Sequence, residues 1–132
     1  MRYRNRKGEK NKTGQRGEKY AARWMRLRGY RIVGRNVEMK RGELDIIAKR
    51  GGSIVFVEVK TRRDNKNIGI YGRPADAVNY EKRKHIISAA QEYLRLHPTK
   101  RTPRIDIIEV YLDPENPRRH RIVQLKSAVK YA

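Results

Sequence analysis

A pair of strand-like runs on either side of Gly51-Gly52 restricts the fold of this chain more than any other feature. The runs span Glu43 to Lys49 and Ile54 to Thr61, and the two glycines between them favour a tight hairpin turn. Both faces of the pair are apolar, with Leu44, Ile46, Val55, Val57 and Val59 on one and Ile47, Ile54 and Phe56 on the other. Such a pair needs cover on both sides, so we expect helices on both faces of the sheet.

The segments around this hairpin complete an α/β pattern. A helix is expected from near Gln15 to Arg28, with Gly29 as its stop, and its apolar side comprises Tyr20, Ala21, Trp24, Met25 and Leu27. Helical sequence resumes at Pro74 and ends near Pro98. Further strands are expected at Tyr30 to Glu38, Ile105 to Leu112 and Arg121 to Leu125. The fold class is therefore α/β, with a central mixed sheet of about five strands flanked by helices.

A length of 132 residues suits one domain. Residues 1–13 are polar and strongly basic, so we expect a flexible basic arm there, followed by a single domain over 14–126 and a C-terminal tail over 127–132. The polar run from Arg62 to Arg73 reads as an exposed loop.

The charge of the chain points to a polyanionic partner. Lysine and arginine number 34 against 14 acidic residues, a net charge of +20, which attracts nucleic acid by long-range attraction and counterion release. A basic amphipathic helix with a bulky apolar face is missing, so we expect no membrane binding. The absence of cysteine excludes disulfides and fits the cytoplasm. The candidate nucleic-acid-binding residues are Arg62, Arg63, Arg73, Lys82 and Lys84.

The hairpin also brings charged residues together. Counting outward from the turn pairs Arg50 with Ser53, Ala48 with Val55, Asp45 with Glu58, and Glu43 with Lys60. The side chains of these last two pairs, Asp45, Glu58, Glu43 and Lys60, then project from one face of the hairpin. Two carboxylates opposite each other on that face are unfavourable unless a cation or a shared proton compensates their charge. Mg²⁺ or Mn²⁺ would suit these oxygen ligands, and Lys60 could orient or deprotonate a water. The competing interpretation is a salt-bridge patch in which Lys60 and nearby arginines neutralise the acids.

These residues also carry a resemblance to a known family. Glu18 on the first helix, Gly42-Glu43-Leu44-Asp45 and Phe56-Val57-Glu58-Val59-Lys60-Thr61-Arg62 resemble the YraN-like family of small bacterial proteins. That family is similar to the PD-(D/E)xK nuclease superfamily, with its restriction-endonuclease-like fold, and to archaeal Holliday-junction resolvases. The resemblance implies that Asp45, Glu58 and Glu18 bind metal and that Lys60 completes the catalytic set. Leu44 stands where the superfamily has proline.

Two hypotheses about function follow. The first is a metal-dependent endonuclease or resolvase-like phosphodiesterase that uses Lys60, Asp45, Glu58 and Glu18 with Mg²⁺ or Mn²⁺, and acts on DNA rather than RNA. By analogy with resolvases, it could form a homodimer. The second is a non-catalytic nucleic-acid-binding accessory module that retains the nuclease fold and uses the hairpin acids structurally.

Overall fold

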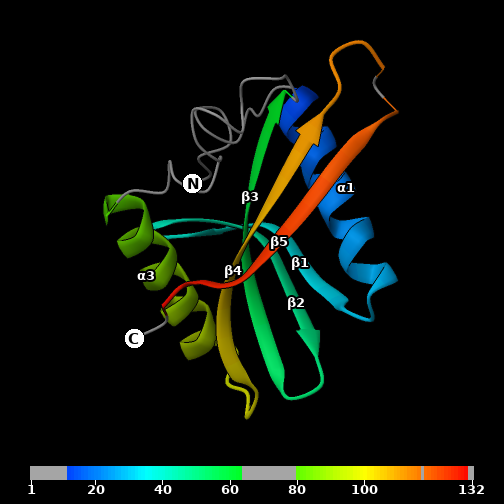
Figure 1. Cartoon of the computed structure of the whole chain (residues 1–132). Coiled ribbons are helices and arrows are strands. Elements are labelled where there is room, and N and C mark those ends of the chain that lie inside the picture. The colour runs from blue at the N-terminus through cyan, green and yellow to red at the C-terminus, as the bar shows by residue number, and fades with distance from the viewer. Residues whose placement is uncertain (1–11, 64–79, 117, 131–132) are drawn as a thin grey trace.

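The alternating apolar runs form a five-stranded sheet with one helix against each face (Figure 1). The computed structural model describes residues 12–63, 80–116 and 118–130. In chain order the elements are α1 (Lys12–Leu27), β1 (Arg31–Met39), β2 (Gly42–Arg50), β3 (Ser53–Arg63), α3 (Tyr80–Leu96), β4 (Thr102–Leu112) and β5 (His120–Val129). The strand order is β1-β2-β3-β4-β5, with β3 and β4 parallel and the other neighbours antiparallel. This confirms the expected mixed α/β sheet, which is consistent with a restriction-endonuclease-like fold.

The core has two layers because the central strands are apolar on both faces. On one face, Ala21, Ala22 and Met25 of α1 pack with sheet residues that include Ile46, Val55, Val57 and Ile108. On the other, Ala89 and Ala90 of α3 pack with Ile47, Phe56, Ile105 and Ile107. Small residues on both helices allow close approach to the sheet. None of the helices in the described part of the chain is long and apolar enough to cross a membrane.

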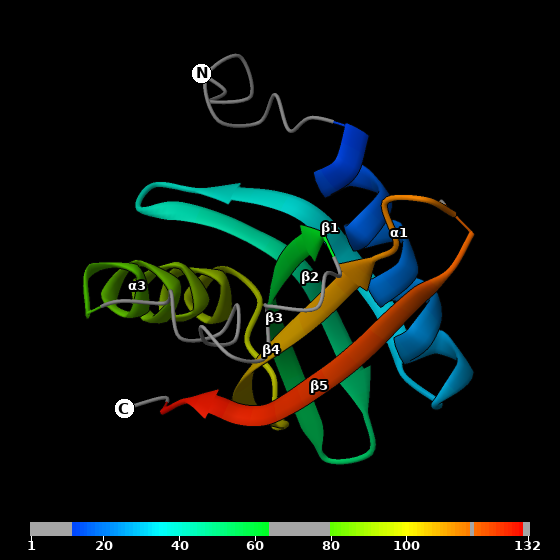
Figure 2. The same cartoon turned by 45° about the horizontal axis from the view of Figure 1, so that its top comes forward.

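The β1–β2 hairpin bends sharply where Asn36 lies opposite Asp45. Asn36 has a φ of 51°, in the left-handed region, and within the described sheet Asp45 is paired in neither the β1–β2 nor the β2–β3 register. Beyond the bend, the tip of the hairpin turns toward α3 (Figure 2), where the Lys40 N–H donates to Glu92 Oε1 at 2.9 Å. The predicted placement of Leu44 beside Ile46 is therefore wrong: Leu44 packs on the α3 side.

Several predicted boundaries shift. The first helix begins at Lys12, so the last two residues of the predicted arm are helical, while residues 1–11 lie outside the described part. β5 continues to the buried Val129, three residues beyond the predicted domain end at 126. Leu27 is 75% exposed rather than part of the apolar side, because it lies in the last turn, beyond the sheet contact.

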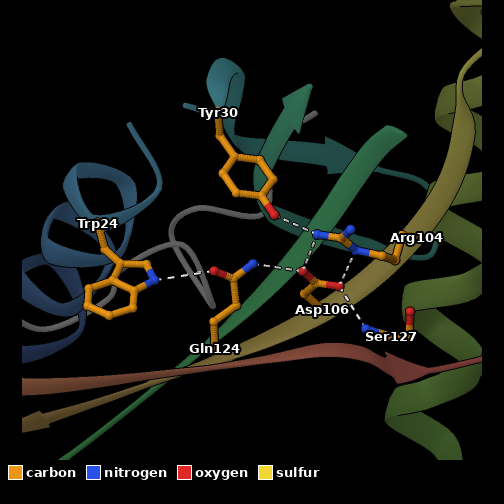
Figure 3. Close-up of polar contacts among 6 residues, drawn as sticks. All are labelled: Trp24, Tyr30, Arg104, Asp106, Gln124 and Ser127. Carbon is orange, nitrogen blue, oxygen red and sulfur yellow. Dashed lines mark hydrogen bonds and ion pairs between the residues drawn. The ribbon is translucent and has the colours of Figure 1, made fainter. Parts of the chain in front are cut away.

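A buried carboxylate accounts for the extension of β5. The register between β4 and β5 shifts between Ile105 and Ile107, and Ser127 in the bulged strand has a φ of 53°. Asp106, which is fully buried, accepts hydrogen bonds from the Ser127 N–H, from Gln124 Nε2 and from two nitrogens of Arg104, each at 2.9 Å (Figure 3). The carboxylate thus satisfies an N–H that the strand ladder leaves without a partner at the bulge.

The same network fastens the end of α1 to the sheet. Trp24 Nε1 donates to Gln124 Oε1 at 3.2 Å, and Arg104 donates to the Tyr30 hydroxyl at 2.8 Å (Figure 3). Because its charge is matched by Arg104 and its oxygens are fully engaged, we assign Asp106 a structural role.

Candidate functional site

A cavity of about 350 Å³ lies where β2 leaves β3. Its walls come from the start of α1, the bend of β2, the end of β3 and the first turns of α3. The charged and polar side chains that line it include Glu18, Asp45, Glu58, Lys60, Lys82 and His85. The cavity therefore collects all four residues predicted to carry the chemistry.

Asp45 owes its position to the break in the strand ladder. The predicted pairs Arg50–Ser53 and Ala48–Val55 are confirmed, but the β2–β3 register ends at Ile46–Val57, and the predicted Asp45–Glu58 pair does not form in the described ladder. Instead, the Val59 N–H donates to Asp45 Oδ2 at 2.9 Å. A side-chain oxygen thus takes the place of a strand carbonyl, which holds the buried carboxylate at the cavity wall.

Glu58 lies among charges of both signs. Its Oε2 is 3.4 Å from Lys60 Nζ and 3.8 Å from Lys82 Nζ, and its side chain is 15% exposed. Burial, and after it the negative charge of Asp45, raises the pKa of Glu58 to about 7, although both lysines oppose the shift. The two lysines therefore do not fully compensate the pair of carboxylates, and an additional cation would favour the ionised form of Glu58.

Lys60 is the buried ammonium of the site. Burial, together with the nearby Lys82, lowers the pKa of Lys60, while the charge of Glu58 acts in the opposite direction. Lys60 follows Glu58 by two residues on β3, so both side chains project from the same face of the strand. The lysine is thus held beside the carboxylate and is more readily deprotonated than a solvated lysine.

Glu18 reaches the cavity from α1 because that helix packs very closely on β3. At the neighbouring Gly17, an added Cβ would collide with the Thr61 side chain, so only glycine permits this approach. Glu18 is buried and lines the cavity. Among the described residues, however, no three His, Cys, Asp or Glu side chains lie close enough together to hold a metal ion, so Glu18 does not complete a three-acid cluster with Asp45 and Glu58.

Two carboxylates are nevertheless a suitable donor set for Mg²⁺ or Mn²⁺. Mg²⁺ commonly keeps several waters and is held by one or two carboxylates together with substrate phosphate. Asp45 and Glu58 supply hard oxygen donors, and burial, followed by the nearby charge of Asp45, raises the pKa of Glu58. The residues present therefore fit a hydrated divalent cation.

The predicted nucleic-acid-binding residues divide into three groups. Lys82 and Arg62 line the cavity, and an Arg62 nitrogen donates to the Thr61 carbonyl at 3.0 Å. Arg63, at the end of β3, and Lys84, on α3, are exposed and are not among the described lining residues. Arg73 lies outside the described residues.

Sequence reasoning missed two residues that line the cavity, Arg41 and His85. His85 follows Lys82 by three residues on α3, a spacing that places both on one side of the helix and could have indicated it. Arg41 precedes β2 in the turn of the bent hairpin, where strand periodicity gives no information.

Comparison with known proteins identifies relatives that match most of the chain. Residues 17–110 match the sequence profile of the uncharacterised protein family UPF0102. The chain is 44% identical over 110 residues to UPF0102 protein TTE1452 of Caldanaerobacter subterraneus, covering 83% of this chain and 87% of the relative. It is 40% identical over 114 residues to UPF0102 protein STH1475 of Symbiobacterium thermophilum, covering 86% and 93%. The chain therefore belongs to family UPF0102, which confirms the resemblance to the YraN-like proteins.

Proposed function

We propose that this protein is a divalent-metal-dependent phosphodiesterase of nucleic acids, an endonuclease or resolvase-like enzyme that acts on DNA in the cytoplasm. The observation that carries the proposal is the meeting of Asp45, Glu58 and Lys60, from two neighbouring strands, at one cavity. Cationic side chains at the same cavity, among them Arg41, Arg62 and Lys82, suit a phosphate group.

The roles of the residues follow from their surroundings. Asp45 and Glu58 would hold the cation, which when bound would activate water and offset charge on the phosphate. Lys60, beside Glu58 and with a lowered pKa, can accept or donate a proton and orient the attacking water. Lys82, whose side chain is half exposed, can reach a phosphate oxygen from α3. Glu18 limits the cavity on the α1 side and can orient water.

A second candidate function is a non-catalytic accessory module that binds nucleic acid and keeps the nuclease fold. The contacts of Glu58 with Lys60 and Lys82 favour it, because they neutralise part of the acidic charge without a metal. In that case the hairpin acids would be structural, and divalent cations would have no specific effect on stability.

Thermal unfolding in the presence of Ca²⁺, Mg²⁺ or Mn²⁺ distinguishes the two candidates. A ligand that binds only the folded state stabilises it by about 2.7 kcal/mol at a hundredfold excess over Kd. We expect a saturable rise in Tm for the wild type and none for Asp45→Asn, which keeps an oxygen for the Val59 N–H. Equal responses of both proteins would indicate a general salt effect and support the second candidate.

Cleavage assays test the activity itself. Branched, flapped and single-stranded DNA, and RNA of the same sequences, are incubated with Mg²⁺ and the wild type, Asp45→Asn or Lys60→Ala. Lys100→Ala is a matched control, because Lys100 is an exposed lysine that is not among the described lining residues. We expect the first two variants to lose cleavage and the control to keep it. Cleavage that survives both site substitutions would refute the proposed active site.

A further inference from the structure

The exposed side of α1 carries a row of five cations that the cavity does not account for. They are Lys12, Arg16, Lys19, Arg23 and Arg26, all exposed and spaced alternately four and three residues apart. At 100° per residue this spacing confines them to about 80° of the helix circumference, over a length of about 21 Å. We call this set the α1 cation row.

Repulsion among the cations of the α1 cation row destabilises the helix. Like charges three or four residues apart on a helix are destabilising by about 0.2 to 0.5 kcal/mol per pair. The one acidic residue of α1, Glu18, is buried and lines the cavity instead of facing the row. Within the described residues, no acid forms an ion pair with any of the five. A polyanion bound along the helix would remove this repulsion.

The position of the row indicates where such a polyanion would lie. Gly14 and Glu18, in the first turns of α1, line the cavity, and the row lies on the opposite, exposed side of the same helix. The end of α1 that carries Lys12 and Arg16 is therefore the end nearer the cavity, although the row itself faces away from it. A membrane surface is a poor alternative, because the apolar side of α1, with Ala21, Ala22 and Met25, is fully buried against the sheet.

The aromatic residues of α1 favour a duplex over an unpaired strand. Tyr20 stacks on His120 with ring centroids 3.8 Å apart, and the Arg28 guanidinium lies 3.1 Å from the centre of the Trp24 ring. Both rings are thus engaged within the protein, whereas binding of single strands usually relies on rings that stack on bases. A straight, rigid line of cations matches the stiff backbone of a duplex.

We infer that the α1 cation row binds the phosphate backbone of a nucleic-acid duplex whose continuation enters the cavity. The direction of the duplex relative to the cavity rests on the proposed function, but binding along α1 does not require cleavage. A substrate must therefore be double-stranded on the α1 side of the phosphodiester bond that is cleaved at the cavity.

The test compares two triple variants with equal loss of charge. Arg16→Gln/Lys19→Gln/Arg23→Gln neutralises the centre of the row. Arg95→Gln/Lys100→Gln/Lys126→Gln is the control, since these three cations are also exposed but lie outside α1. Fluorescence anisotropy gives Kd for a labelled DNA duplex, an RNA duplex and the single strands over a range of salt concentrations, and unfolding curves check that each variant is folded.

The slope of log K against log salt is negative, and each lost phosphate contact makes it less steep by about 0.9 for B-DNA. We expect the slope for the DNA duplex to become less negative by about 2.7 in the row variant and to stay near the wild-type value in the control. Equal changes in the two variants would overturn the inference, and an equal loss for single strands would overturn the assignment to a duplex. If the wild type cleaves nothing but binding still depends on the row, the proposed function fails and the row stands.

Discussion

Glu58 provides the sharpest test of the electrostatics of the cavity, through the substitution Glu58→Gln. The folded protein raises the pKa of this carboxyl from 4.5 to about 7. A raised folded-state pKa means that Glu58 favours folding when protonated, and that this contribution is lost as pH rises from about 4.5 through about 7. Because a tenfold change in an equilibrium corresponds to about 1.4 kcal/mol, the ionised carboxylate destabilises the metal-free protein by about 3 kcal/mol at pH 8.

Glutamine keeps the shape of the side chain but cannot ionise. In metal-free buffer at pH 8 we therefore expect Glu58→Gln to be more stable than the wild type by up to about 3 kcal/mol, or roughly 10 °C in Tm for a domain of this size. At pH 5 the two proteins should unfold almost together. Thermal and urea unfolding at both pH values measure the difference, with Glu115→Gln as a control because Glu115 is exposed. A variant that is less stable than the wild type at pH 8, or an offset that does not change with pH, would refute the reasoning.

Three further predictions concern the site and its supports. Mg²⁺ should raise the Tm of the wild type more at pH 8 than at pH 6, because Glu58 must lose its proton to bind a cation, and calorimetry in buffers of different ionisation enthalpy should detect proton release. Asp106→Ala should lower the free energy of unfolding by about 3 to 5 kcal/mol in urea, because Arg104 and its neighbouring donors lose a buried partner; a loss below 1 kcal/mol would contradict the role of the network. Gly17→Ala should cost about 1 to 3 kcal/mol through its collision with Thr61, and Thr61→Ala in the same protein should recover part of it.

The layers of the fold could be predicted because they depend on local patterns. The glycine pair at 51–52 marks the central hairpin, and the two-sided apolar strands require cover on both faces. The bend at Asn36 could not be predicted, because one residue with positive φ leaves the order of polar and apolar residues unchanged. The packing of Leu44 on the α3 side, at the bent part of the hairpin, was missed for the same reason. The bulge of β5 could not be predicted from the sequence either, because it depends on a hydrogen bond to Asp106, which is distant in sequence.

For the candidate site, alternation along β3 was sufficient to place Glu58 and Lys60 together. The contact between Asp45 and the Val59 N–H was out of reach, because it exists only where the strands separate. The α1 cation row is a different case. Its spacing of four and three residues is visible in the sequence, but only the structure establishes that the opposite side of α1 is buried and that the first turns of this helix lie at the cavity.

The parallel pairing of β3 with β4 has a bearing on when during folding the cavity can exist. The antiparallel strands β1 to β3 are neighbours in sequence and can associate through short connections, whereas a parallel pair requires a long crossover to close first. Asp45, Glu58 and Lys60 precede the crossover, while Lys82 and His85 come from the helix within it. A nascent chain that has emerged only as far as β3 therefore contains Asp45 and Glu58 but lacks the wall of the cavity that α3 forms. A ligand that contacts Lys82 or His85 can therefore stabilise only chains in which α3 has already docked.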